Sequence, residues 1–199
     1  MTNIFFTSDT HFNHAKIIQL ANRPFADLAE MQETMIQRWN ERVKPGDLVY
    51  HLGDFAITYG PRRDSALVDA ILSRLNGSKF LVIGNHDRKE VFQHKRWVKS
   101  VPYHEIKTDF DGKRQPIVLC HYPLRSWNHL HDGGWMLHGH SHGSLIDAGG
   151  KTMDVGVDVH DYAPISLEEV GQYMARREIV SYDHHRRSVS ESESADLPQ

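Results

Sequence analysis

Short apolar runs alternate along the chain with longer segments in which apolar residues recur at helical spacing. The short runs contain β-branched or aromatic residues and are bounded by turn residues, so they are predicted to be buried strands. They are residues 3–7, 48–52, 80–83 and 117–119, with further candidates at 136–137, 153–159 and 179–182. Asp111 and Gly112 stand between two extended stretches and predict a hairpin turn.

Three longer segments predict helices. Asp27 and Glu30 match a capping box, and the apolar residues that follow lie on one helical stripe until Pro45 ends it. That stripe consists of Leu28, Met31, Met35, Trp39 and Val43. A second helix is predicted over residues 64–75, and a third begins at Ser166. The resulting order, β-α-α-β-α-β followed mostly by strands, favours a mixed, layered α/β domain.

The length of 199 residues favours a single domain with a sizeable core. Residues 183–199 alternate Ser and Glu with almost no bulky apolar residue, so they cannot bury enough surface to become ordered. We therefore expect one folded domain over residues 1–182 and a disordered polar tail over residues 183–199.

Charge and composition exclude several classes of protein. Lys and Arg number 23 against 26 Asp and Glu, without a long basic run, so neither sequence-specific nucleic-acid binding nor an anionic membrane surface is indicated. The sequence has no run of 18 apolar residues, which excludes a membrane span, and no leader-like opening, which argues against secretion. The single Cys120 fits a reducing compartment, so we expect a cytoplasmic protein, with its oligomeric state left open.

Histidine stands out from this ordinary composition, with 15 residues, six of them between His121 and His142. Polar motifs also follow the predicted strands, and ligands bind at the carboxyl ends of strands in open α/β sheets, so five loops are expected to converge. These motifs are DTH at 9–11, GD at 53–54, GNHD at 84–87, His121 and GHSH at 139–142. Carboxylate, amide oxygen and imidazole without thiolate suit divalent Mn, Fe, Zn, Co or Ni.

The motif residues divide into two sets of four ligands if Asp54 bridges two ions. The first set adds Asp9, His11 and His142, and the second adds Asn85, His121 and His140. Two ions about 3.5–4 Å apart form a clamp for in-line displacement at phosphorus. His86 and Asp87 remain, and we interpret His86 as the general acid and Asp87 as the group that orients its imidazole.

Taken in order, the motifs DTH, GD, GNHD, H and GHSH resemble the calcineurin-like metallophosphoesterase superfamily over residues 3 to about 182. The phrases WNERVKPGDLVYHLGDF and MDVGVDVHDYAPIS resemble its small bacterial and phage members. This resemblance implies a four-layer αββα sandwich of two mixed β-sheets flanked by helices. The ligand sets given above agree with what the resemblance implies, and among the suitable ions we expect Mn.

The resemblance also guides the choice of substrate. The phosphoprotein phosphatase branch carries GDxxDRG, whereas this chain has GDFAITYG and lacks the Arg that would contact phosphate. We therefore expect a hydroxide that bridges two metal ions to hydrolyse phosphodiesters of small molecules or nucleotides, with phosphomonoesters as the alternative substrates. Four residues near the motif loops are candidate substrate contacts, although solvation at the surface is the competing interpretation for each. They are Asn13, His14, Arg23 and Arg125.

Two other histidines and two other function classes complete the interpretation of the motifs. His138 is interpreted as structural, whereas His51 is either packed or hydrogen-bonded to a ligand carboxylate. Residues 139–143, GHSHG, also match the nucleophile elbow of serine hydrolases, with Asp158 and His160 downstream. That elbow requires a helix after the serine, but the next residues lead through glycines toward an extended run. A serine hydrolase is therefore the remote alternative, beside a metal-binding module without catalysis.

Overall fold

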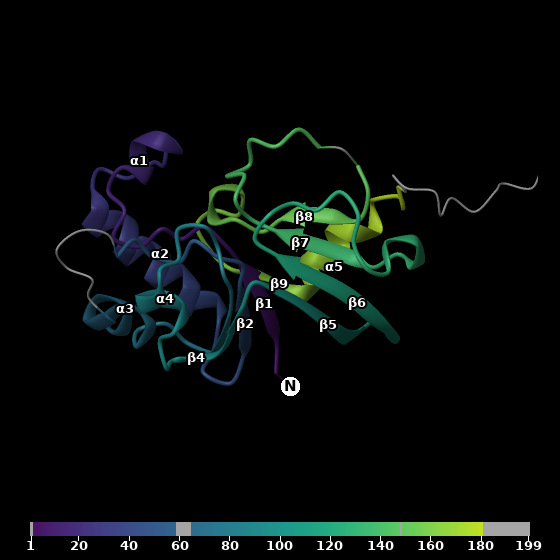
Figure 1. The fold of residues 1–199 in the computed structure, drawn as a ribbon, viewed down its shortest axis with the longest axis horizontal. Helices are drawn as coiled ribbons and strands as arrows, with labels where there is room; N and C mark the ends of the chain where they lie inside the picture. The colour runs from purple at the N-terminus through teal and green to yellow at the C-terminus, as the bar shows by residue number, and fades with distance from the viewer. Residues whose placement is uncertain (1, 59–64, 148, 181–199) are drawn as a thin grey trace, which may run out of the picture.

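The computed structural model describes residues 2–58, 65–147 and 149–180, which form two mixed β-sheets with helices (Figure 1). The first sheet has the order β4 (Trp97–Val101), β3 (Ser78–Val82), β2 (Leu48–His51), β1 (Ile4–Thr7) and β9 (Ile165–Ser166). The second has the order β5 (Tyr103–Phe110), β6 (Lys113–Cys120), β7 (Trp135–His138) and β8 (Thr152–Asp154). Each sheet contains both parallel and antiparallel pairs, which confirms the predicted α/β class.

The described residues form the helices α1 (Ile17–Leu20), α2 (Leu28–Arg42), α3 (Ser65–Leu72), α4 (Lys89–Phe92) and α5 (Leu167–Ala175). Side chains cap the N-termini of α2 and α5, whereas α1 and α4 have no side-chain cap. Asp27 caps α2 by accepting a hydrogen bond from the Glu30 backbone, while the Glu30 side chain accepts from Ala26 instead of completing the expected box. Ser166 and Glu169 form the full capping box of α5. The predicted third and first helices are therefore confirmed, and α3 ends at Leu72, before the expected residue 75.

Alternate residues of the first sheet face two different cores, as the two-residue period of a strand requires. Phe5 and Val49 pack with residues of α2 and α3, including the predicted stripe residues Met31, Met35 and Trp39. Phe6 and Tyr50 point the other way and pack against the second sheet. Helices α2, α3 and α4 thus cover one face of the first sheet, and the second sheet covers the other (Figure 1).

An irregular segment of the chain packs against the outer face of the second sheet. Val118 and Met136 on this face pack against Leu124 and Trp127, which belong to the segment between β6 and β7. This segment contains Pro123 and two glycines, which disfavour a helix, and its regular part is the short 3-10 turn η1 (Leu130–Asp132). The fourth layer here is an irregular segment, whereas α5 packs into the core between the sheets.

The strand predictions were right in most places. Asp111 and Gly112 have φ values of 49° and 71° and join β5 to β6, which confirms the hairpin. Residues 153–159 were wrongly predicted as one strand, because β8 ends at Asp154 and the chain turns into η2 (Val157–Val159). Ile179 and Val180 form no strand, and residues 181–182 lie outside the described residues, as does the predicted tail at 183–199.

The topology directs several strand ends to one edge of the molecule. Strands β1, β2 and β3 run parallel in the first sheet, and β6 and β7 run parallel in the second. Their carboxyl ends are followed by the five loops that carry the polar motifs. Across the described ranges, no helix has the length and apolar character needed to cross a membrane.

Candidate metal centre

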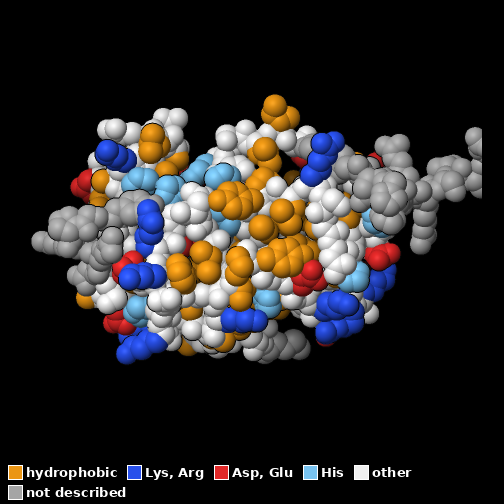
Figure 2. Space-filling model, in the orientation of Figure 1, with side chains coloured by type: hydrophobic (Ala, Val, Ile, Leu, Met, Phe, Trp, Pro, Cys, Tyr) orange, Lys and Arg blue, Asp and Glu red, His pale blue; other side chains and the backbone are white. Residues whose placement is uncertain are grey.

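The five loops bring two groups of metal-ligating side chains together, and histidine side chains gather on this face of the molecule (Figure 2). One group contains Asp9, His11 and His142, and the other contains Asp54, His121 and His140. Within each group, the candidate ligand atoms lie within 4.8 Å of one another. These are the residues that the sequence divided between two ions, with Asn85 as the remaining member.

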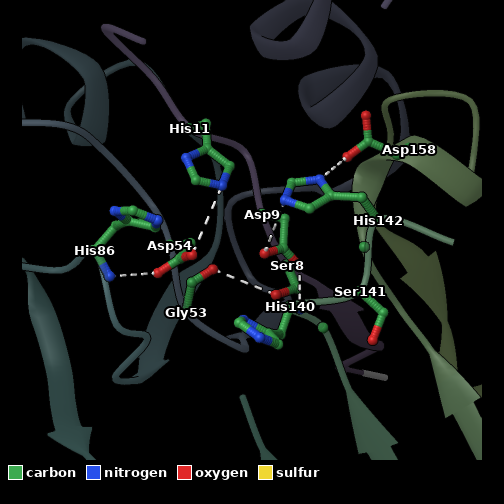
Figure 3. A network of polar contacts seen from close by, with 12 residues as sticks. Ser8, Asp9, His11, Gly53, Asp54, His86, His140, Ser141, His142 and Asp158 are labelled. Atoms are coloured by element: carbon green, nitrogen blue, oxygen red, sulfur yellow. Dashed lines mark hydrogen bonds and ion pairs between the residues drawn. The ribbon is translucent and has the colours of Figure 1, made fainter. Parts of the chain in front are cut away.

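Asp54 lies between the two groups. Its Oδ2 atom is 3.6 Å from His11 Nε2 on one side and 3.5 Å from His121 Nε2 on the other. His11, Asp54 and His142 approach one another from separate loops (Figure 3). Asn85 Oδ1 lies 3.0 Å from His121 Nε2, which brings the amide oxygen to the second group. The geometry therefore suits a carboxylate shared by two neighbouring ions.

Two buried atoms in the first group have no hydrogen-bond partner among the described residues. They are Asp9 Oδ1 and His11 Nε2. A buried polar atom without a partner destabilises a fold by about 1–3 kcal/mol, so such atoms are rare unless a ligand satisfies them. Burial also raises the pKa of Asp9 to about 6 and lowers the pKa of His11 to about 2. A divalent cation would favour the Asp9 carboxylate and takes His11 in its neutral form, so these residues fit a metal ion.

Two of the candidate imidazoles are held so that Nε2 faces the centre. His121 Nδ1 lies 2.7 Å from the Leu52 carbonyl oxygen, and His142 Nδ1 lies 2.7 Å from Asp158 Oδ2. Carbonyl and carboxylate oxygens only accept, so Nδ1 carries the hydrogen and Nε2 is left as the ligating atom. Sequence reasoning considered Asp158 only as a member of a serine-hydrolase triad and missed this contact.

Arg23, a candidate substrate contact from the sequence, is buried in this structure and bound to other residues of the protein. The residue is 4% exposed and binds Asp158 through two hydrogen bonds, from Nε to Oδ1 at 2.8 Å and from Nη2 to Oδ2 at 2.9 Å. Its guanidinium also donates to the backbone carbonyls of Asp9 and Thr10. Arg23 therefore joins the DTH loop to the residue that orients His142.

Asp87, the predicted partner of His86, contacts backbone groups of two loops. Its buried carboxylate accepts hydrogen bonds from the backbone N–H groups of Asp54, Phe55 and Gly84, each at 2.9 Å. Burial raises the pKa of Asp87 to about 7, although these hydrogen bonds favour the carboxylate. The side chain thus fastens the loop after β3 to the loop after β2, where Asp54 is held.

His86 lies at the rim of the centre and is half-buried. Its backbone N–H donates to Asp54 Oδ1 at 2.8 Å, and its ring centroid lies 5.4 Å from that of His11 (Figure 3). His14 Nδ1 lies 3.3 Å from His11 Nδ1, so His14 is close to the centre. Asn13 donates its side-chain N–H to the Ile57 carbonyl, and Arg125 lines a separate cavity.

His51 and His138, which the sequence placed outside the ligand sets, are both buried. His51 Nε2 lies 3.0 Å from the Thr10 hydroxyl, and its ring packs against Phe55 and Trp97. It therefore contacts a neighbour of the ligands and no ligand carboxylate. His138 Nδ1 donates to the Gly139 carbonyl at 3.0 Å. The structural interpretation of His138 agrees with this contact.

The backbone around the centre is strained. Five candidate ligands have left-handed φ values, a conformation that costs a non-glycine residue roughly 1–3 kcal/mol. They are Asp9 (58°), His11 (49°), Asp54 (57°), His140 (69°) and His142 (46°). The loops also approach one another closely at Gly139, where an added Cβ would lie 2.0 Å from Ser8 Oγ and 2.3 Å from Asp9 Oδ2. Such strain is concentrated at functional sites, where the surrounding fold maintains it.

The serine-hydrolase alternative is not supported by the structure. The residues after Ser141 form turns and irregular backbone where the elbow requires a helix. Asp158 binds Arg23 and His142, and His160 Nε2 donates to the Asp154 carbonyl. The proposed members of a triad are therefore engaged in other contacts.

Comparison with known proteins gives matches over most of the chain. The model of the calcineurin-like phosphoesterase family matches residues 2–183. The chain is 33% identical over 186 residues to an uncharacterized protein of Methanocaldococcus jannaschii, MJ1445, covering 90% of this chain and 96% of that protein. It is 30% identical over 192 residues to the Gene 66 protein of Mycobacterium phage D29, covering 83% and 93% respectively. A crystal structure of a protein of unknown function from Aquifex aeolicus, AQ665, gives a TM-score of 0.66 at 26% identity, covering 87% of this chain and 100% of that chain.

Proposed function

Because the chain belongs to the calcineurin-like phosphoesterase family, we propose that its clustered side chains hold two divalent cations and that it hydrolyses phosphate esters there. The observation that carries this proposal is the position of Asp54 Oδ2, at nearly equal distances from His11 Nε2 and His121 Nε2. Asp9 Oδ1 and His11 Nε2, which have no hydrogen-bond partner among the described residues, support a cation in the first group. When bound, such a pair of ions lowers the pKa of a water and neutralises negative charge on phosphate oxygens.

The protein itself orients the metal-binding histidines and provides a proton for the departing oxygen. Leu52 and Asp158 fix the rings of His121 and His142, so two imidazole ligands are directed before an ion arrives. His86 is partly exposed beside His11 and is not needed to complete either set of ligands. We therefore assign His86 the protonation of the departing oxygen, which is the step an alkoxide leaving group needs.

Phosphodiesters are the preferred substrates in this proposal. A phosphomonoester dianion carries more negative charge than a diester, so a monoesterase benefits from additional cationic side chains at the phosphate. Here Arg23 lies near the centre but is bound to Asp158 and two carbonyls, and GDFAITYG lacks the arginine of GDxxDRG. A phosphodiester carries less negative charge than a monoester, so it needs fewer cationic side chains at the phosphate and fits this site better.

The proposal is tested with protein stripped by a chelator and then reloaded with Mn²⁺. We expect no hydrolysis before reloading, and afterwards faster hydrolysis of bis(p-nitrophenyl) phosphate than of p-nitrophenyl phosphate. Elemental analysis should find two ions for each chain. Full activity in protein that elemental analysis shows to be free of transition metals contradicts the proposal. A preference for the monoester leaves the metal centre in place and supports the alternative phosphomonoesterase.

A further inference from the structure

A cavity of about 670 Å³ lies against the outer face of the second sheet. Its wall includes Arg125 and Trp127 from the segment after β6, and Leu145 and Ile146 from the segment after β7. Its described wall contains none of the clustered ligand side chains, so it is distinct from the metal centre. Its volume falls within the range of pockets that enclose a small organic molecule.

The cavity adjoins the metal centre along the chain. Gly143 in its wall directly follows His142, and Val159 directly follows Asp158, so each wall residue is one Cα step of about 3.8 Å from a residue of the centre. Asp154, also in the wall, accepts a hydrogen bond from the Gly143 backbone at 3.1 Å. The cavity therefore lies beside the metal centre.

Aromatic and apolar groups form much of the wall. Trp127 donates its indole N–H to the Gly134 carbonyl, which fixes the ring in place while it lines the cavity. Tyr173 and Leu145 add further apolar surface, and hydrophobic side chains lie beside the histidines on the face shown in Figure 2. A planar ring is the group that such a wall binds best, because stacking on an aromatic side chain adds to burial.

Two polar groups in the cavity favour a heterocycle over a hydrocarbon chain. His138 donates through Nδ1 to Gly139, so in the neutral ring Nε2 is left as an acceptor. Thr152 lies on the neighbouring strand, where its backbone pairs with β7, and its hydroxyl has no hydrogen-bond partner among the described residues. A hydrocarbon chain would bury both groups without a partner, at about 1–3 kcal/mol for each. The edge of a nucleobase supplies both donors and acceptors.

We propose that this cavity binds the nucleoside part of a phosphodiester whose phosphate lies at the metal centre. Trp127 stacks on the base, and His138 and Thr152 contact its polar edge. This inference rests on the proposed function for the position of the phosphate. It narrows the substrate to nucleotide esters, and it assigns recognition to residues outside the polar motifs.

Binding is measured first, without catalysis. Adenosine, which lacks phosphate, is titrated into the full chain by calorimetry, and we expect a Kd of about 1 mM or tighter. Thr152→Phe, which fills the cavity, and Trp127→Leu, which removes the aromatic face, should each weaken binding by about 5- to 100-fold. Trp127→Phe should restore most of it. Thr108→Phe makes the same change on strand β5 outside the cavity wall and should leave binding unchanged.

Kinetics then connect the cavity to the centre. With Mn²⁺-loaded protein, the kcat/KM ratio of thymidine 5′-(p-nitrophenyl) phosphate to methyl p-nitrophenyl phosphate should fall by about 5- to 100-fold in Thr152→Phe and Trp127→Leu. Equal losses on both esters, or adenosine affinity that neither variant changes, overturn the inference while the phosphoesterase proposal stands. Adenosine binding that depends on Trp127, without hydrolysis of any ester, contradicts the proposed function and preserves the nucleoside site.

Discussion

Replacing Asp158 by Asn tests how the buried Arg23–Asp158 pair supports the metal centre. Asp158 Oδ2 accepts hydrogen bonds from both His142 Nδ1 and Arg23 Nη2, while Oδ1 accepts from Arg23 Nε. Asn can place its single oxygen at the Oδ2 position and keep two of these bonds. Its NH₂ group then faces Arg23 Nε–H, so two donors oppose one another and the carboxylate charge is lost.

The expected losses of metal affinity and of folding stability follow from these contacts. Loss of a group that orients a ligating histidine weakens metal affinity by about 10- to 100-fold, which equals about 1.4–2.8 kcal/mol. Arg23 is 4% exposed, and loss of the partner of a buried charge costs about 3–5 kcal/mol of folding stability. Because Asn keeps one acceptor, we expect the lower end of that range. The affinity loss should be confined to the set that contains His142, since His121 is oriented by Leu52.

The assay is a calorimetric titration of metal-free protein with Mn²⁺, with thermal unfolding of the same samples. Asp161→Asn is the matched control, because Asp161 forms an ion pair with Arg38 but its side chain is 87% exposed. Exposed pairs contribute about 0–1 kcal/mol, so this variant should titrate and unfold like the wild type. Unchanged affinity at both sets in folded Asp158→Asn protein would refute the role given to Asp158. Equal loss at both sets would point to a general effect on the fold.

Three further predictions concern the loops. His86→Gln should slow hydrolysis of alkyl esters by about 10²–10⁴ and of p-nitrophenyl esters much less, because phenolate departs without a proton. This variant should still bind two ions, and an equal loss of rate on both ester types would contradict the role given to His86. Gly139→Ala should lower the stability of the fold by about 1–3 kcal/mol and weaken Mn²⁺ binding in calorimetry, because the new Cβ would displace Asp9. An unchanged Mn²⁺ titration would contradict this prediction and show that the loop relaxes around the added methyl group. Ser141→Ala should keep most of its turnover, whereas a loss of about a thousandfold would restore the serine-hydrolase hypothesis.

The sequence predicted the convergence of the motif loops because that convergence depends on topology alone. Asp9, Asp54 and His121 each follow a strand, and parallel neighbours deliver their carboxyl ends to one edge. Strand β4 was not predicted from the sequence. It is an edge strand whose residues 98 and 99 are exposed, so it lacks the apolar run that is typical of a buried strand.

The partners of the buried polar residues could not be predicted in the same way. Arg23 and Asp158 are separated by 135 positions, and nothing local distinguishes this arginine from one at the surface. Asp87 follows His86 directly, which suggested a contact between neighbours, but its carboxylate bonds to backbone groups that include two residues of another loop. The hydrogen-bond partner of a buried side chain depends on which donors and acceptors lose contact with water when the loops pack. Only the tertiary structure determines which groups these are.

Each candidate ligand group draws residues from both sheets. Asp9 and His11 follow a strand of the first sheet and are grouped with His142, which follows a strand of the second. Asp54 likewise comes from the first sheet, whereas His121 and His140 come from the second. An ion in either group would therefore act as a cross-link between the two halves of the sandwich. By mass action, the free energy needed to separate the two sheets then rises with the concentration of free metal. When that concentration is one hundred times the Kd of a site, the added stability is about 2.7 kcal/mol.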